Sequence, residues 1–195
     1  MAAESNTRNM VLCLTAVCLL CSAILAGVFA VTKKPIEEAS SKALVEALSI
    51  VLPSDGEIDV NACNAELDGV QYEYYVQTVA GEPAAWAVKS TVNGFGGPLT
   101  VLVGVEKNGI VHATKVLEHS ETPGLGAKCG TEESFYGQFS GFDSNAKQLK
   151  VKKDGGDVDA ITASTITSRA YTLAVANAVK LVAGLQPKME GTNNE

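Results

Sequence analysis

The chain has 195 residues, of which 46% are hydrophobic and 19% are charged, and this fits one folded domain with a small appendage. A net charge of −7 at pH 7, with no basic stripe, argues against nucleic acid as a partner. Three of the five cysteines lie in the apolar run over residues 10–31, and the two cysteines and two histidines outside it, without a C-x-x-C pair, supply no ligand set for iron–sulfur, zinc or c-type haem, so no metal site is expected.

The first predicted element is a transmembrane helix over residues 10–31, after a short N-terminal tail over residues 1–9. No residue from Met10 to Val31 is charged. A helix of this length spans about 33 Å, enough to cross a hydrocarbon core of roughly 30 Å. The alternative is a cleaved secretory signal, because Val28 and Ala30 fit a small-residue cleavage pattern. The length of the apolar run favours the anchor.

A separate helical stalk is predicted over residues 32–53. Pro35 suits a first helical position, and Pro53 is expected to stop the helix. Between the two prolines, apolar residues recur at helical spacing, and charged residues occupy the opposite side. A folded domain over residues 54–188 and a flexible tail over residues 189–195 complete the predicted organisation.

The domain is predicted to begin with an antiparallel meander of about four strands. These runs are rich in Val, Thr, Tyr and Ile, and they cover residues 70–78, 85–92, 99–106 and 110–117. Asn108-Gly109 is a hairpin signal of the type I′ turn, in which both central residues need positive φ.

Further along, residues 132–139 are predicted to form a short helix and residues 148–152 another strand. Apolar residues then recur at helical spacing from Ile166 and end near Pro187, which predicts a C-terminal helix. The fold class is therefore α+β: a membrane helix, then an antiparallel sheet with flanking helices. Whether Cys63 and Cys129 pair is not determined by the sequence.

A cluster of small polar residues over residues 159–169 stands directly before the C-terminal helix. The exposed backbone N–H groups and the positive dipole end of a helix favour a phosphate at such a position. The alternative is ordinary N-capping, because Ser and Thr begin many helices that bind no ligand.

Two glycine-rich segments, residues 93–98 and 121–126, lie on either side of two predicted strands. Glycines permit positive φ and a close approach of the backbone to a flat or phosphorylated ligand. Neither segment is a G-x-G-x-x-G fingerprint, and the chain contains no P-loop motif.

Taken in this order behind one N-terminal span, these segments resemble the FMN-binding domain family of ion-translocating oxidoreductases, which includes the G component of Rnf complexes (RnfG) and the C component of Na⁺-NQR. The family pattern D-x-x-(S/T)-G-A-T is similar to the stretch from Asp159 to Thr165. The H-x-E-T-P-G-L-G segment is matched from His119 to Gly126. One departure is that Ala163-Ser164 stands where the family has Gly-Ala.

The resemblance implies that FMN is joined through its phosphate to Thr165 by a separate flavin transferase. It also implies cofactor contacts by residues around the phosphate, namely Thr162, Ala163, Ser164, Thr167 and Arg169, and by residues lining the isoalloxazine, namely Gly94, Gly96, Gly97, Glu121, Thr122, Pro123, Gly124, Leu125 and Gly126. No catalytic residue is expected, and Glu121 is interpreted as a positioning group.

By this resemblance, the chain would relay electrons between redox partners of a membrane-bound ferredoxin:NAD⁺ oxidoreductase. A span without carboxylate, amine or imidazole groups is not expected to conduct ions, so ion movement would belong to other members of the complex. The resemblance places the flavin domain on the extracytoplasmic side of the inner membrane, whereas Lys33 and Lys34 slightly favour a cytoplasmic C-terminal side, by a margin too small to decide orientation. The alternatives are the C component of Na⁺-NQR, a free-standing membrane-anchored FMN reductase, and a binding module without redox function.

Overall fold

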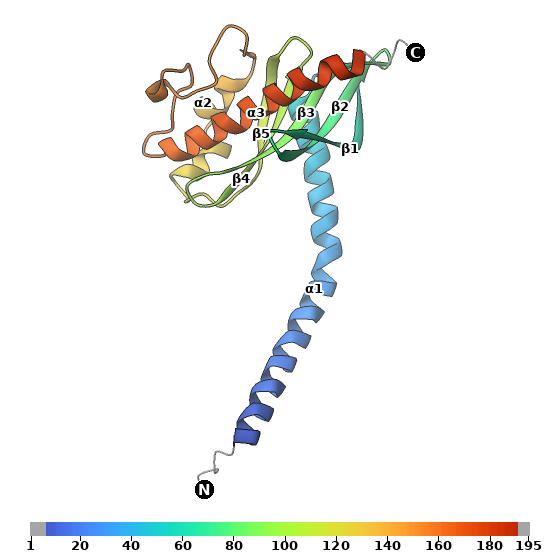
Figure 1. The fold of residues 1–195 in the computed structure, drawn as a ribbon, viewed down its shortest axis with the longest axis vertical. Coiled ribbons are helices and arrows are strands. Elements are labelled where there is room, and N and C mark those ends of the chain that lie inside the picture. The colour runs from blue at the N-terminus through green and yellow to red at the C-terminus, as the bar shows by residue number, and fades with distance from the viewer. Residues whose placement is uncertain (1–6, 191–195) are drawn as a thin grey trace. The chain divides into compact units, whose positions relative to one another are not determined.

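The computed structural model describes residues 7–190 (Figure 1). Most of the expected N-terminal and C-terminal tails, residues 1–6 and 191–195, lie outside the described residues. The chain divides into two compact units, residues 1–43 and 44–195. Each unit is described by itself.

The helix α1 extends from Thr7 to Val51 without interruption. Pro35 lies inside it, so the prediction of a second helix that starts at Pro35 is wrong. A proline removes only one backbone hydrogen bond, and the Lys, Glu, Ala and Leu residues that follow favour a helix. The predicted stop before Pro53 is confirmed.

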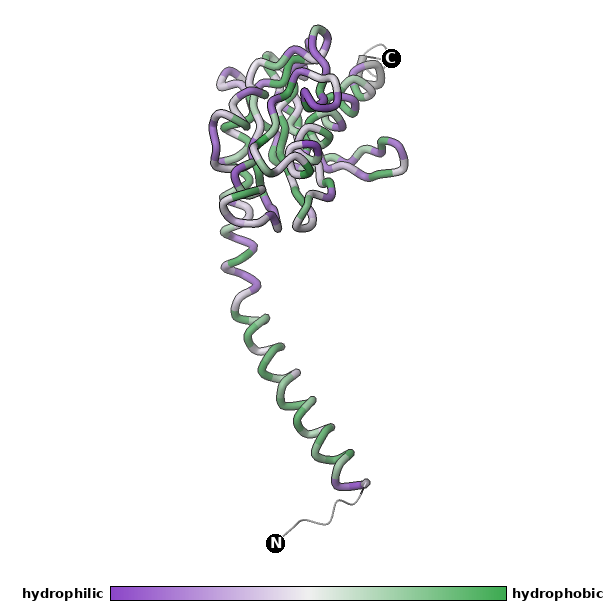
Figure 2. Tube along the Cα trace, turned by 90° about the vertical axis from the view of Figure 1, so that its left-hand side faces the viewer, coloured by the Kyte–Doolittle hydropathy of each residue, from purple (hydrophilic) through white to green (hydrophobic). Residues whose placement is uncertain are grey.

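The N-terminal part of α1 is apolar on all sides, and residues 10–31 are exposed. Figure 2 shows hydrophobic residues along this part and hydrophilic residues along the turns that follow. Among the described residues, α1 is the one helix long and apolar enough to cross a membrane. A helix that is apolar all round is typical of a membrane span, so α1 is consistent with a membrane anchor.

The second unit contains a six-stranded antiparallel sheet whose strands follow one another in chain order. The strands are β1 (Glu57–Leu67), β2 (Val70–Val79), β3 (Glu82–Asn93), β4 (Pro98–Glu106), β5 (Ile110–His119) and β6 (Phe142–Asp143). The four predicted strands are confirmed as β2 to β5. The strands β1 and β6 were not predicted.

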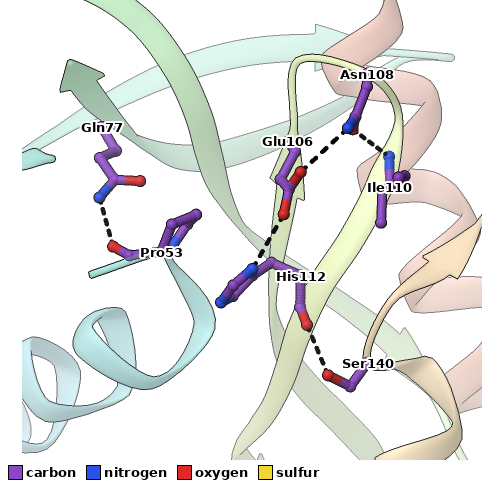
Figure 3. Close-up of polar contacts among 7 residues, drawn as sticks. All are labelled: Pro53, Gln77, Glu106, Asn108, Ile110, His112 and Ser140. Atoms are coloured by element: carbon purple, nitrogen blue, oxygen red, sulfur yellow. Dashed lines mark hydrogen bonds and ion pairs between the residues drawn. The ribbon is translucent and has the colours of Figure 1, made fainter. Parts of the chain in front are cut away.

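Turn residues explain most of this meander. Asp68 and Gly69, with φ of 53° and 80°, join β1 to β2 and form the two-residue turn with positive φ that hairpins favour. This Asp-Gly pair is the sequence signal that could have revealed β1. At Asn108-Gly109 the hairpin is confirmed, but only Gly109 has positive φ, at 83°. The loop therefore has three residues, and Asn108 braces it by donating to Glu106 and accepting from the Ile110 N–H (Figure 3).

One face of the sheet packs against the last turns of α1. Leu48 and Val51 are buried there in a cluster with Tyr75 and Leu102 of the sheet. A Cβ atom at Gly104 would collide with the Val51 carbonyl, so a glycine is required for this close approach. A hydrogen bond of 2.6 Å from Gln77 Nε2 to the Pro53 carbonyl also holds the chain after α1 against β2 (Figure 3).

The opposite face carries the main hydrophobic core, and α3 (Thr165–Glu190) lies across it (Figure 1). Alternation along the strands explains the division: in β3, Trp86 and Val88 face α3, whereas Ala85 and Ala87 face α1. Most of the predicted apolar stripe of α3 is confirmed, since Ala174, Ala178 and other members of the stripe are buried in this core, whereas Ile166 and Leu173 are 50% and 53% exposed. The helix continues past Pro187 to Glu190, so its predicted end is too early.

Short elements connect β5 to α3. They are η1 (Gly126–Gly130), α2 (Glu133–Tyr136), η2 (Gly137–Phe139), β6 and η3 (Lys152–Asp154). The predicted short helix over residues 132–139 is confirmed as α2 and η2. The predicted strand over residues 148–152 is wrong, because its backbone bonds locally: Lys152 N donates to the Val158 carbonyl, and Val158 N donates to the Lys150 carbonyl. Cys63 and Cys129 are both free thiols.

Candidate functional site

The N-terminus of α3 is preceded by a tight turn. Ser164 is the residue before the helix, and its N–H donates to the Ile161 carbonyl. Ser168 Oγ accepts from the Ile161 N–H and donates to the Ser164 carbonyl, both at 2.9 Å. Ala163 has a φ of 62°, a left-handed conformation in which glycine is favoured. This is the position at which the resembling family has glycine.

The three neighbouring hydroxyl groups differ in exposure. Ser164 is 7% exposed and Thr167 is 1% exposed, whereas Thr165 is only partly buried. The Thr167 hydroxyl is already engaged, because it donates to Glu121 Oε2 at 2.9 Å. Among these three residues, Thr165 is therefore the one that an incoming group reaches most easily.

Glu121 joins the three segments that the sequence singled out. It is 5% exposed, and its two carboxylate oxygens accept hydrogen bonds from different directions. Oε1 accepts from the Phe95 N–H at 2.8 Å, and Oε2 accepts from the Thr167 hydroxyl. The Glu121 N–H donates to His119 Nδ1 at 3.3 Å. Each carboxylate oxygen therefore accepts one hydrogen bond from another segment.

The glycine-rich turn between β3 and β4 packs against the segment around Glu121. A Cβ atom at Gly94 or Gly126 would collide with the Glu121 carboxylate, and one at Gly96 would collide with the Ser120 carbonyl. These glycines therefore allow the two segments to approach each other closely. The sequence had instead predicted that these glycines let the backbone approach a ligand.

A pocket of about 360 Å³ opens where these segments meet. Its lining residues are Phe95, Glu121, Thr122, Leu125, Gly126, Ala163, Ser164, Thr165, Ile166 and Thr167. Phe95, Leu125 and Ile166 are large apolar residues that remain 68%, 46% and 50% exposed. The pocket thus combines uncovered apolar surface with the N-terminus of a long helix, which suits a ligand with a flat apolar part and an anionic end.

Several predicted contact residues do not line this pocket. Thr162 is exposed beside it, and Gly94, Gly96, Gly97, Pro123 and Gly124 are absent from its lining. Arg169 points to another partner: its guanidinium donates two hydrogen bonds of 2.7 Å to the Asp154 carboxylate. These hydrogen bonds hold the pKa of the Asp154 carboxyl below its usual range.

Two residues at the site were missed by sequence reasoning. Phe95 lines the pocket, and its place between glycines in a turn could have marked it as an exposed aromatic residue. Lys153 Nζ donates to Thr165 Oγ1 at 3.2 Å. No sequence signal connects Lys153 with a residue twelve positions later, because the contact depends on how the loop folds back.

Two polar groups of the main hydrophobic core, Cys129 and Tyr171, have raised pKa values. Burial, followed by the charge of Glu121, raises the pKa of the Cys129 thiol to about 11. Burial also raises the pKa of Tyr171, whose hydroxyl donates to Thr114 Oγ1 at 2.7 Å. Among the described residues, no group of three His, Cys, Asp or Glu side chains could hold a metal ion.

Comparison with known proteins finds a matching family and several similar proteins of one kind. Residues 94–180 match the family described as FMN-binding domain. The G component of the ion-translocating oxidoreductase complex of Shewanella baltica is 35% identical over 176 residues, covering 83% of this chain and 82% of that protein. The protein of the same name from Vibrio cholerae is 34% identical over 185 residues, covering 88% of each chain.

Among solved structures, similarity is found to the C component of the Na⁺-translocating NADH-quinone reductase from Parabacteroides distasonis. The TM-score is 0.42 and the identity is 26%, over 55% of this chain and 58% of that chain.

Proposed function

This chain belongs to the RnfG family, the G subunits of ion-translocating oxidoreductase (Rnf) complexes, and we propose that it carries FMN on Thr165 through a phosphoester. It has an FMN-binding domain. It is one member of a multi-protein oxidoreductase complex. The attachment, the residues around it and the electron-carrier role are the proposed part.

The accessibility of the Thr165 hydroxyl carries the proposal of the attachment site. Thr165 opens α3 at the edge of the pocket, whereas the hydroxyls of Ser164 and Thr167 belong to buried residues. A phosphate on Thr165 would meet the free N–H groups and the positive dipole end of α3, and Lys153 would add a charge-assisted contact.

The apolar part of the pocket fits the ring of the cofactor. Phe95, Leu125 and Ile166 come from three separate segments and leave apolar surface uncovered around one cavity. An isoalloxazine ring would cover that surface and gain the free energy of apolar burial. The glycines of both segments then act indirectly, because they hold Phe95 and Glu121 in place.

FMN supplies the capacity to take up and release one or two electrons. The protein has to bind and orient it, and Glu121 contributes by fixing the Phe95 backbone and the Thr167 side chain. The two hydrogen bonds that Glu121 accepts give it a positioning role, and we assign to the chain the role of an electron carrier that serves other proteins of the complex. A free-standing reductase would need an acid or base of its own.

Residues 10–31 of α1 contain no Asp, Glu, Lys, Arg or His. Because ionisable groups mark ion paths in membranes, we assign ion movement to the other proteins of the complex. The flavin domain is placed on the extracytoplasmic side of the inner membrane on the strength of the resemblance. A protease added to intact spheroplasts would then cleave the domain, and protection of the domain would contradict this orientation.

Flavin fluorescence of the denatured chain tests the attachment. The full chain, produced together with a flavin transferase, should give a fluorescent band on a denaturing gel. The Thr165→Val variant should give none, because it loses the hydroxyl and keeps the shape. Ser164→Ala and Thr167→Val are the matched controls and should remain fluorescent. A fluorescent Thr165→Val band, or a peptide mass that places the flavin on another residue, would reject Thr165 as the tether.

A further inference from the structure

Lys153 is a cation in direct contact with the proposed tether. Its ammonium group donates to Thr165 Oγ1 at 3.2 Å, although the two residues come from different elements, η3 and α3. Its side chain is exposed and belongs to no part of the hydrophobic core. The contact therefore has no evident role in folding.

The loop that carries Lys153 is held in place on both sides of this residue. Asp154 accepts the two hydrogen bonds from Arg169, which lies one turn after Thr165 in α3. Lys152 forms an ion pair of 2.7 Å with Asp159, before α3. The Arg169 pair joins η3 to the start of α3, the Lys152 pair joins η3 to the segment before α3, and between them the Lys153 side chain is directed at the Thr165 hydroxyl.

We propose that Lys153 is the positioning residue for flavin attachment: its ammonium group orients Thr165 Oγ1 and neutralises the phosphate that becomes bonded to it. This inference rests on the proposed attachment at Thr165. Arg169, predicted as the phosphate contact, instead acts one step away by fixing the loop through Asp154.

The chemistry of the transfer explains why a cation is useful there. A phosphoester forms from a hydroxyl only if the phosphorus carries a leaving group, as in the diphosphate of a flavin dinucleotide. A bond forms between Thr165 Oγ1 and the phosphorus of the FMN half, and the bond from this phosphorus to the bridging oxygen breaks. The nucleoside monophosphate leaves with that oxygen, and the hydroxyl proton passes to a base of the transferase. No electron is gained or lost.

Negative charge grows around Oγ1 during this transfer, and one negative charge remains on the diester. The N-terminus of α3 offers roughly half a positive charge, and an ammonium group within hydrogen-bond distance supplies a full one. Because Lys153 is exposed, its effect is expected to be screened by salt. Arginine at this position would keep the charge and the donors, whereas methionine would keep only the apolar stem.

The test is the rate of flavin attachment to the purified full chain in detergent, with a flavin transferase and flavin adenine dinucleotide. Lys153→Met should lower the initial rate about tenfold at low salt, which corresponds to about 1.4 kcal/mol. Lys153→Arg should stay within about threefold of the parent chain, since the charge is kept. Lys180→Met is the matched control, because Lys180 is also an exposed paired lysine but its partner is Asp68, and its rate should be unchanged.

Two further measurements would distinguish a role in attachment from a loss of stability in Lys153→Met. The thermal midpoint of Lys153→Met should equal that of the parent chain, and its rate should depend less steeply on salt. Equal rates for Lys153→Met and the parent, or equal losses in the Met and Arg variants, would overturn the role of Lys153 while attachment at Thr165 stands. Continued labelling of Thr165→Val would instead reject the proposed attachment itself.

Discussion

Replacing Ala163 with glycine is expected to stabilise the domain, although the same change destabilises most helices and strands. Ala163 has a φ of 62°, and a left-handed conformation costs a residue with a Cβ atom about 1–2 kcal/mol. Glycine avoids this cost but gives the unfolded chain more freedom, which offsets about 0.4–1 kcal/mol. Ala163 is exposed, so little packing is lost. The net gain should be about 0.5–1 kcal/mol, or about 1–4 °C in Tm for a chain of this size.

The assay is urea unfolding of the full chain in detergent, followed by tryptophan fluorescence. Trp86 is the only tryptophan in the sequence and is 1% exposed in β3, so its signal reports on the sheet domain. Two controls bracket the result. Ala80→Gly, at a φ of 54°, should also stabilise the domain. Ala183→Gly, at an exposed position in α3, should destabilise it by about 1 kcal/mol.

The reasoning would be refuted if Ala163→Gly lowered the urea midpoint as much as Ala183→Gly does. The turn before Ser164 would then not be strained by alanine. The departure of this chain from the glycine of the family pattern would have no energetic consequence.

Two further predictions concern buried polar groups. Glu121→Leu should lower the free energy of unfolding in urea by about 2–4 kcal/mol, because the Phe95 N–H and the Thr167 hydroxyl both lose their acceptor. Glu121→Gln keeps one acceptor and should cost about 1 kcal/mol. Equal losses in the two variants would contradict the role of the two hydrogen bonds. The Cys129 thiol, whose pKa is raised from 9.0 to about 11, should resist iodoacetamide at pH 8 until the chain is denatured, as peptide mass spectrometry would show. Because the fold favours the neutral thiol, this contribution to stability is complete below pH 9 and is lost as the pH rises towards 11, so Cys129→Ala should unfold with a smaller dependence on pH in that range.

Local patterns in the sequence determined the elements that depend on local physics. Three features depend on residues that are near neighbours in the sequence. They are an uncharged run long enough to span a membrane, strands separated by turn residues, and a helical apolar stripe. For the same reason, the helix end before Pro53 was predictable. Errors arose where local signals compete. Pro35 suggested a helix start but lies within α1, and the apolar residues near Val151 suggested a strand where the structure has an isolated parallel bridge between Val151 and Val158.

Only the tertiary structure decided which partners the residues of the candidate site contact. The resemblance favoured Thr165 over the neighbouring hydroxyls of Ser164 and Thr167, and packing distinguishes the three residues, because Ser164 and Thr167 are buried and Thr165 is only partly buried. Packing also directed Arg169 to Asp154 and Lys153 to Thr165, so that the cation at Thr165 is Lys153 instead of the expected Arg169. Hydrogen bonds between segments, and the burial that accompanies them, depend on how a loop and a helix meet in space. The spacing of residues along the sequence does not indicate these contacts.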